Sequence, residues 1–369
     1  MNSEGLFKDY EFDEKGSEKS IAMKLSTLTL LTLLGLLLPA PALAQAKKAK
    51  DTHTFSFYLE NDTFADTDRE YTSGVRLTLI SPGLTGYREN PKLPEWSYPV
   101  IEQLPFVNEP GFQHAVSFSI GQNIYTPEDL ERSDLIQDDR PYAGITYLAI
   151  GFHSKNSHRM DSLELDLGIV GPHSYAEQCQ KAIHDWIDST DPKGWDNQLK
   201  DEPVLNIFYG RKWKLMQSGV GRGFGYDVIP HMGCALGNAA TFANAGAQIR
   251  FGCNLPNDFG TYLIRPGCDS NAPSDKQDPR FFPRYHRVGI HFFAGVDGHV
   301  VLRNIFLDGN TFQDSHSVDK EYFVVDLVGG VGMIIYRFKI TYTYVYKTKE
   351  YKTQKDEQKY GAITLSYSF

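Results

Sequence analysis

Hydrophobic and polar residues alternate along most of the chain after residue 53, in segments of about ten residues separated by polar turns. In the first segment, Phe55, Phe57 and Leu59 fall on one face, and the residues between them carry polar groups. A period of two is typical of a β-strand, whose successive side chains point to opposite faces. The alternation therefore predicts strands at 53–60, 72–80, 115–120, 145–152, 162–168, 203–214, 226–238, 243–254, 285–299, 321–334, 335–348 and 360–369.

These twelve segments predict an all-β fold, a twelve-stranded antiparallel barrel that spans a membrane. An even number of strands puts both termini on the periplasmic side of a bacterial outer membrane. The last strand places Ile363, Leu365, Tyr367 and Phe369 on one face, and an aromatic final residue resembles the signal that barrel-assembly machinery uses. A soluble β-sandwich also alternates and is the other fold considered. The long strands and the end at Phe369 favour the barrel.

One segment departs from this pattern. Between Ser174 and Asp188 the apolar residues recur at steps of three and four, which predicts a helix near 174–190 in an extracellular loop. Its apolar positions are Ala176, Cys179, Ile183, Trp186 and Ile187. Gln180 and His184 stand on its polar side. The connections 82–113 and 254–284 are rich in Pro, Gly and Asn and show no chemistry of their own.

The beginning of the chain has the parts of a secretory signal peptide. Met23 and Lys24 precede an apolar stretch that ends at Leu38, and the small residues of 42–44 follow. The apolar stretch is shorter than the roughly 20 residues that a membrane-spanning helix needs. We expect residues 1–44 to be an upstream extension and a signal peptide, with Met23 as the start and cleavage after Ala44, and 45–369 to be the barrel.

Composition agrees with export to a Gram-negative outer membrane. The chain has 21 Tyr and 23 Phe, which suits the aromatic girdles of a barrel, and its net charge of −9 argues against a nucleic-acid partner. Four cysteines in an oxidising compartment permit three pairings, of which Cys234 with Cys253 would join neighbouring segments.

Polar residues gather where the first predicted strand ends. Glu60, Asn61 and Asp62 close that strand, and Thr72 and Ser73 begin the next. Carboxylate, amide and hydroxyl oxygens on one rim are the hard ligands that Ca²⁺ prefers. A polar turn at the membrane surface explains the same residues, so both interpretations stay open.

His184 is the candidate general base, because an imidazole titrates near neutral pH and takes a proton from water. A helix histidine is more often a solvated or packing residue, and His173 on the same loop has the same alternative. Ser73 and Ser174 lack the G-x-S-x-G turn of a serine nucleophile. Arg140 follows two acids and is expected to form an interior ion pair.

Taken in order, the polar motifs resemble those of the outer-membrane lipid A 3′-O-deacylase family. The resemblance extends over about 53–369 and is carried by Glu60–Asp62, Tyr71–Gly74, Gln122–Pro127, Asp139–Gly144, Gly168–Pro172, Gln180–His184 and Gly194–Asp196. It implies a calcium-dependent enzyme that removes the 3′-linked acyloxyacyl chain of lipid A. Its active site would lie between the barrel wall and the loop helix, near the outer surface.

Carried over by position, the resemblance assigns catalysis to His184, and both catalysis and metal binding to Asn61, Asp62 and Thr72. Gln180 and Asp191 become candidate substrate contacts, and Arg132 a candidate contact for a lipid A phosphate.

The chain departs from the family pattern at one position. A functional glutamate six residues after the histidine is replaced by Thr190, beside Asp191. The partners implied are lipopolysaccharide, the outer membrane and barrel-assembly machinery. The alternatives are a porin or passive channel, a structural barrel that binds lipopolysaccharide through divalent ions, and an outer-membrane serine phospholipase.

Overall fold

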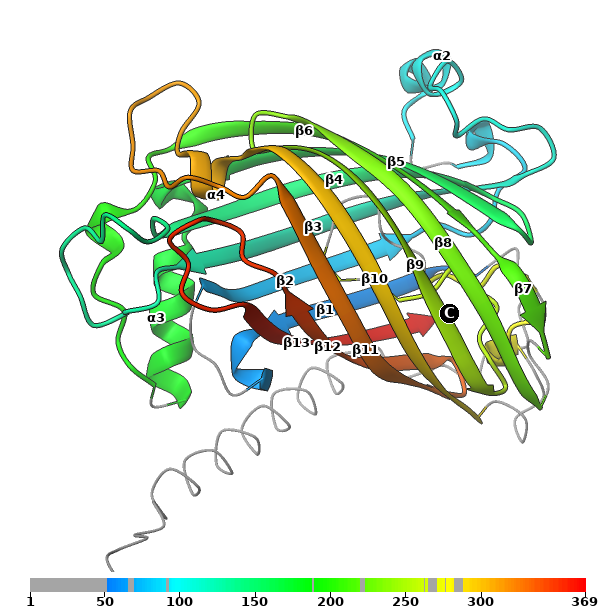
Figure 1. Ribbon diagram of the computed structural model, residues 1–369. Coiled ribbons are helices and arrows are strands. Elements are labelled where there is room, and N and C mark those ends of the chain that lie inside the picture. Colours follow the sequence, from blue (N-terminus) through cyan, green and yellow to red (C-terminus); the bar gives the residue numbers. More distant parts are fainter. Residues whose placement is uncertain are drawn as a thin grey trace, which may run out of the picture.

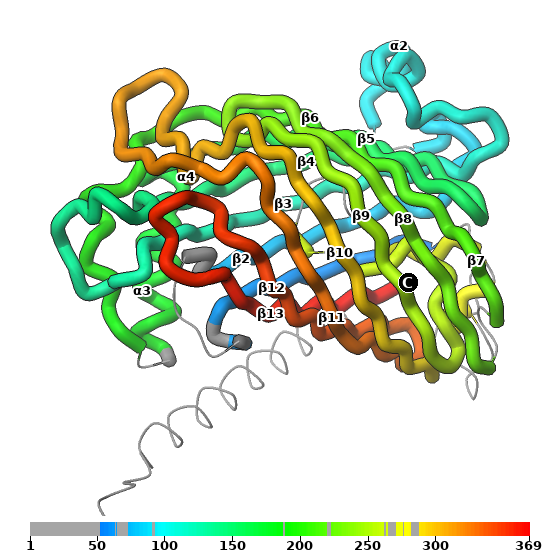
Figure 2. Tube along the Cα trace, in the orientation of Figure 1, coloured from blue at the N-terminus to red at the C-terminus, as the bar shows by residue number. Residues whose placement is uncertain are grey.

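The computed structural model describes residues 52–369, apart from 66–69, 91–92, 188, 220–222, 262, 265–270, 276 and 282–287. The expected signal peptide and its cleavage site lie outside the described residues. Strands dominate the described part, and they form one closed antiparallel sheet in which the first strand pairs with the last. In Figures 1 and 2 the blue β1 and the red β13 run side by side and complete the cylinder.

The predicted twelve-stranded barrel is confirmed, with β6 and β8 paired directly. A thirteenth strand, β7, is a short addition that pairs with β8. The strands are β1 (Thr54–Asn61), β2 (Glu70–Ile80), β3 (Gln113–Thr126), β4 (Ala143–Lys155), β5 (Arg159–Val170), β6 (Glu202–Trp213), β7 (Leu215–Ser218), β8 (Phe224–Gly237), β9 (Ala240–Cys253), β10 (Val288–Asn304), β11 (Phe323–Ile335), β12 (Phe338–Lys347) and β13 (Gln358–Ser368).

Short helices lie in the connections. They are η2 (Asp62–Ala65), η3 (Tyr87–Glu89), η4 (Glu95–Ser97), α2 (Tyr98–Ile101), η5 (Pro172–Ser174), α3 (Ala176–Ile187), η6 (Trp195–Asn197), η7 (Pro279–Phe281) and α4 (Ile305–Asp308). The predicted loop helix is thus confirmed as α3. Within the described ranges, no helix has both the length and the apolar character to cross a membrane.

The two ends of the barrel differ. We call the end that carries α3, α4 and the connection 348–357 the loop end, and the end that holds Thr54 and Phe369 the terminal end (Figure 1). The connection with α2 lies at the terminal end. Because strands alternate in direction, β1 and β3 reach the loop end with their last residues and β2 and β4 with their first.

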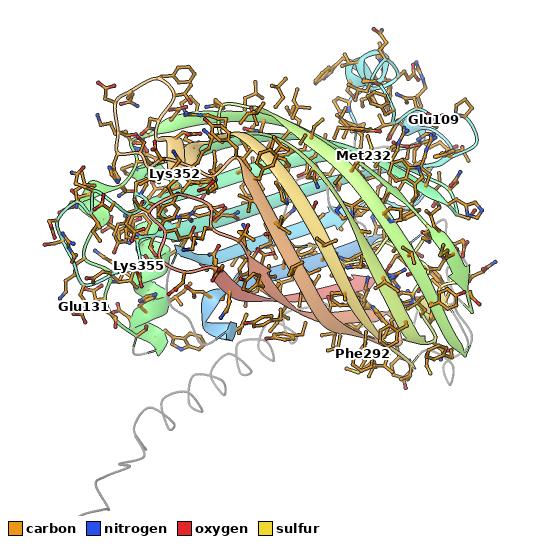
Figure 3. All side chains as sticks on the ribbon, viewed as in Figure 1. Glu109, Glu131, Met232, Phe292, Lys352 and Lys355 are labelled. Atoms are coloured by element: carbon orange, nitrogen blue, oxygen red, sulfur yellow. The ribbon has the colours of Figure 1, made fainter. Side chains whose placement is uncertain are left out.

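Alternation sorts the side chains into an apolar outer face and a polar lumen. On β9, Arg250 is buried inside while Phe251 is 44% exposed. Met232 on β8 and Phe292 on β10 belong to the same exposed apolar belt (Figure 3). An apolar belt around a closed sheet suits hydrocarbon, which offers no partner for an open strand edge.

Buried charges fill the lumen toward the terminal end. Asp258, from the connection between β9 and β10, accepts hydrogen bonds from Arg250, Arg280 and Lys339, at 2.6, 3.1 and 2.7 Å. Arg250 also pairs with Asp227, and Arg280 with Asp278. We define these six residues as the ionic plug. The connection 254–284, for which the sequence indicated no chemistry, contributes Asp258, Asp278 and Arg280 to it.

The cysteine pairing between Cys234 and Cys253 is wrong. Both are free and exposed, as is Cys179. In the β8–β9 register, Cys234 lies opposite Ala243 and Cys253 lies opposite Phe224, so nearly the whole strand separates the two sulfurs. Cys268 lies outside the described residues.

Candidate active site

Helix α3 lies against the outer face of the barrel wall, where it contacts β3 and β4. On β4, Ile145 and Tyr147 line the lumen, so Gly144 and Thr146 face outward. Thr146 and Gln122 both donate hydrogen bonds to the carbonyl oxygen of Ser174, just before the helix, at 2.7 and 2.8 Å. The start of α3 is therefore fixed to the wall by polar contacts.

Close packing at this point requires a glycine. A Cβ atom placed on Gly144 would lie 2.0 Å from the Cβ of Ala176 and 2.6 Å from the Oγ of Ser174. Ala176, Ile124 and Trp195 pack together beside this contact, with Leu130 and Tyr142. The helix can approach the wall because β4 has no side chain there.

The buried face of α3 includes two polar residues, Gln180 and His184. Ala176, Gln180 and His184, four residues apart, are 1%, 2% and 6% exposed. Ile183 and Trp186 are 43% and 51% exposed. Two polar side chains of α3 therefore face the wall while two large apolar ones are exposed, which is the reverse of a helix packed on a soluble core.

His184 is held in a defined orientation. Its Nδ1 atom forms a hydrogen bond with the carbonyl oxygen of Thr190, an acceptor only, so Nδ1 carries the proton. In that tautomer Nε2 has a free lone pair, and Nε2 makes no hydrogen bond with any described residue. Thr190, which replaces the glutamate of the family pattern, therefore orients the imidazole through its backbone carbonyl. This contact does not depend on the Thr190 side chain.

Gln180 lies one helical turn before His184 on the same face. Its Oε1 accepts a hydrogen bond from the indole nitrogen of Trp195 at 2.8 Å. Its Nε2 is buried and makes no hydrogen bond with a described residue. A buried donor without an acceptor costs about 1–3 kcal/mol, so this amide can gain a hydrogen bond from a ligand.

Asn61 lies at the same end of the barrel as α3 and on the same outer face. Glu60 lines the lumen, so Asn61, the next residue of β1, faces outward. Asn61 lies opposite Ser73 of β2, and Ser73 lies opposite Ile124 of β3, which packs beside Ala176. Asp62 follows at the start of η2 and is 1% exposed.

The backbone of Thr72 lies at a β-bulge. The pairing of β2 with β3 shifts between Tyr71 and Ser73, so Thr72 is an extra residue on its strand. Bulges redirect side chains and are frequent beside active sites. The side chain of Thr72 lies outside the described residues, as do Asp66 and Asp68.

The dimensions of a helix and a sheet indicate which strands lie beside His184. Eight residues separate Ala176 from His184, which advances the helix about 12 Å. Neighbouring strands are about 4.8 Å apart, so the same distance spans between two and three strands. Helix α3 runs across the strand direction at the loop end (Figure 1). Counted from β4, a distance of two to three strands reaches β2 and β1.

The donor atoms suit a hard cation. Asn61 offers an amide oxygen and Asp62 a buried carboxylate, and both are oxygen ligands of the kind that calcium takes. No group of three or more His, Cys, Asp and Glu side chains in the described ranges is arranged to hold a metal. Among the described side chains near Asn61, a calcium ion would have the Asp62 carboxylate together with amide, hydroxyl and backbone oxygens.

Comparison with known proteins identifies the family. The family model described as "Outer membrane protein LpxR" matches residues 28–369. The chain belongs to the LpxR family. A search of curated proteins finds no match. This membership and the closed barrel make the chain a bacterial outer-membrane protein, and the resemblance seen in the sequence is confirmed.

The solved structure of LpxR from Salmonella typhimurium shares the fold. It is 17% identical, with a TM-score of 0.65, over 85% of this chain and 99% of that one. The β domain of the Bordetella autotransporter BrkA is 11% identical, with a TM-score of 0.39, over 86% of this chain and 98% of that one.

Within the LpxR fold, Glu60 does not join Asn61 and Asp62 on one rim as the sequence suggested. Strand alternation turns Glu60 into the lumen, where its Oε1 accepts a hydrogen bond from the backbone N–H of Ile264. Glu60 also lines a lumen cavity of about 220 Å³, together with Asp166 and His299. The predicted cluster is therefore divided between the two faces of the wall.

Arg132 and Asp191 lie at the loop end but do not contact His184 through any described interaction. Arg132 pairs with Asp134 and lines an open hollow of about 610 Å³ that also includes Thr190. Five acids line the same hollow, namely Glu128, Asp129, Glu131, Asp138 and Asp139. The role of Arg132 in phosphate binding stays a prediction, and this acidic surrounding does not favour it. Asp191 is exposed.

Loops at the loop end of the barrel hold the segment after α3 in place. Lys193 donates from its backbone to the carbonyl of Leu130 at 2.9 Å, which joins the segment after α3 to the loop 127–142. Arg140 forms its ion pair with Glu350 at 2.8 Å and not with its neighbouring acids. Burial alone would raise the pKa of Glu350, but the charges of Lys347 and Arg140 outweigh it and hold that pKa at about 2.

Of the two serine candidates, Ser174 is hydrogen-bonded within a turn, and Ser73 lies on β2 opposite Asn61. The Ser174 hydroxyl donates to the carbonyl oxygen of Gly171 at 2.6 Å, which closes the short η5 turn. His173 is exposed, and its Nδ1 atom forms a hydrogen bond with the carboxylate of Asp201. Sequence reasoning missed Gly144 and Trp195 as supports of the site, although both belong to motifs that it singled out.

Proposed function

We propose that this LpxR-family protein hydrolyses the 3′-linked acyl ester of lipid A in the outer leaflet of the outer membrane. Family membership supports lipid A modification. The observation that carries the hydrolytic proposal is His184, a buried imidazole on the outer face of the barrel whose Nδ1 is fixed by Thr190. A site on the outer face receives a lipid laterally from the bilayer.

The chemistry proposed is direct attack by water. The Nε2 atom of His184 takes a proton from a water molecule as its oxygen bonds to the ester carbonyl carbon. When the tetrahedral intermediate collapses, the bond to the sugar oxygen breaks, and His184 returns its proton to that oxygen. A fatty acid and a free hydroxyl result, with no covalent acyl-enzyme. The buried amide of Gln180 is placed to donate to a carbonyl oxygen of the substrate.

Calcium is proposed as the cofactor. Asn61 and Asp62 would hold it, with Thr72 as the further ligand that the family resemblance implies. A bound calcium ion supplies positive charge opposite the oxygen that becomes negative in the transition state. The protein's own contribution is a partly dry site, because the wall and α3 exclude bulk water from His184 and Gln180.

A passive channel is the weaker proposal. In the described part of the lumen, Arg76 and Glu164 form an ion pair at 2.8 Å, and the ionic plug lies farther along. These side chains are at most 2% exposed. The lining of a hydrated conduit would stay exposed, so the buried charges favour a filled barrel over an open pore.

The decisive experiment is mass spectrometry of lipid A from a Gram-negative host with and without the protein. Wild-type protein is expected to remove the mass of the 3′ acyl or acyloxyacyl chain. His184→Ala should lower the release roughly 100- to 10,000-fold, the usual effect of losing a general base. His173→Ala, which removes an exposed histidine of the same loop, is the matched control and should retain activity. Heat-modifiable migration in gels verifies that each variant folds.

Two results would contradict the proposal. Undiminished release by His184→Ala would exclude the imidazole as the base. Conductance in planar bilayers without any change in lipid A would favour the channel instead.

Metal dependence is tested separately on purified protein. A calcium chelator should abolish release, and added calcium should restore it. Magnesium prefers smaller, near-octahedral sites and should not replace calcium. Full activity after exhaustive chelation would remove calcium from the proposal and leave the role of His184 to be tested by its own variants.

A further inference from the structure

The exposed surface of α3 has two unlike flanks. At about 100° per residue, Cys179, Ile183 and Trp186 fall in one sector, roughly a quarter turn from the buried face of Gln180 and His184. All three are exposed. We call this sector the apolar flank. The opposite sector, the polar flank, consists of Glu177, Gln178, Lys181 and Asp185.

The polar flank faces the loops beyond the barrel end. Lys181 forms an ion pair with Glu177 at 2.7 Å, and that hydrogen bond raises the pKa of Lys181. Asp191 and Asp196 also attract the Lys181 charge. Both acids belong to the segment after α3, which packs against the loop 127–142 through Lys193. This flank is therefore directed toward the aqueous side.

The apolar flank is continuous with the lipid-facing belt. Helix α3 rests on the outer face at Gln122 and Thr146 through the Ser174 carbonyl. The next outward residues along the same two strands are Ile120 and Leu148, 48% and 61% exposed. With the polar flank directed at the loops, the apolar flank is directed along the strands toward these residues.

We propose that the apolar flank of α3 lies among the acyl chains of the membrane leaflet at the loop end. The helix then occupies the boundary between hydrocarbon and water, with its polar flank in the headgroup region. An amphipathic helix in this position buries its apolar side about 5–10 Å into the boundary of headgroups and chains. A tryptophan at that depth is typical of membrane interfaces, because its ring is both apolar and a donor.

This inference explains the reversed burial of α3. In a soluble protein, Ile183 and Trp186 would turn inward and His184 outward. Here the solvent beside the wall is lipid, so apolar side chains are stable on the exposed flank and polar side chains are stable in the contact with the wall. The inference rests on the outer-membrane location and the geometry of α3, and it holds whether or not the protein hydrolyses lipid A.

The test places an environment-sensitive fluorophore on each flank. One variant keeps Cys179 as its single cysteine, with Cys234, Cys253 and Cys268 replaced by alanine. The matched variant adds Cys179→Ala and carries the label at Asp185→Cys on the polar flank of the same helix. Both are reconstituted in phosphatidylcholine vesicles with or without bromine on the acyl chains, which contain no lipid A.

The label at Cys179 should emit at shorter wavelength and lose severalfold more intensity to brominated chains than the label at Asp185→Cys. Aqueous iodide should quench the two in the opposite order. Strong iodide quenching at both positions, without quenching by brominated chains at Cys179, would overturn the proposal. Disulfide-linked dimers through Cys179 under mild oxidation would assign the flank to a second copy of the chain.

Ile183→Glu gives a second, independent readout. A charge on the apolar flank should detach α3 and increase protease cleavage within 171–201 while the barrel keeps its heat-modifiable migration. Asp185→Glu, a charge on the polar flank, should leave cleavage unchanged. Equal resistance of both variants would contradict a lipid-immersed flank. Neither readout requires acyl release, so a failure here is distinct from a failure of the proposed hydrolysis.

Discussion

Two groups of buried polar residues in this barrel differ in how completely they are hydrogen-bonded. In the ionic plug, Asp258 receives hydrogen bonds from three cations, and Arg250 and Arg280 each have a second acid. Under α3, one ring nitrogen of His184 and the amide nitrogen of Gln180 make no hydrogen bond with a described residue. A buried group that is fully paired stabilises the fold, whereas one with unused capacity is available to a ligand.

Removing Asp258 gives the largest expected effect and tests the paired side of this comparison. Asp258→Ala leaves three buried cations without their shared acceptor, which should destabilise the barrel by about 3–5 kcal/mol. Urea unfolding followed by tryptophan fluorescence measures the change. Asp134→Ala, which breaks the exposed pair with Arg132, should leave the midpoint unchanged. An unaltered midpoint in Asp258→Ala would mean that the plug is not structural.

Displacing α3 from the wall should silence the site without unfolding the barrel. In Gly144→Ala the new Cβ meets Ala176 at 2.0 Å, so the helix must move outward. A displacement of about 1 Å at a catalytic group costs on the order of 100-fold in rate. Gly329→Ala is the matched control, because a Cβ there has open space around it. Acyl release and urea unfolding are measured together, and equal loss of both would point to misfolding instead.

The smallest effect separates the two functions of Gln180. Gln180→Met removes both the acceptor for Trp195 and the unused donor, while Trp195→Phe removes the hydrogen bond between them and keeps the Gln180 donor. If the donor contacts substrate, Gln180→Met should lower acyl release about tenfold further than Trp195→Phe, the value of one good hydrogen bond. Identical losses in the two variants would leave Gln180 as a support for Trp195 only.

Much of the fold could be predicted from the period of two along the strands. Each predicted strand is present, although most extend beyond the alternating core, as β3 does on both sides of 115–120. The helix was also readable from its spacing. Its orientation was not, because the amphipathic pattern says which residues share a face but not whether the medium beside that face is lipid, protein or water.

The site was predicted less completely. Alternation along β1 separates Glu60 from Asn61, although the two are neighbours in the motif and the sequence alone predicts one cluster. The plug could not be foreseen, because Asp258, Asp278 and Arg280 lie in an irregular connection without any period. Thr190 illustrates a limit of sequence comparison. Its backbone carbonyl orients His184, and a comparison of side-chain types does not detect a backbone contact.

The pairing of β1 with β13 links the proposed metal site to closure of the barrel. Asn61 lies opposite Gly361, so the rim beside Asp62 is completed by residues near the very end of the chain. A barrel in which β13 is not paired with β1 lacks one wall of the proposed metal pocket. The proposed hydrolysis of lipid A would therefore require a closed cylinder.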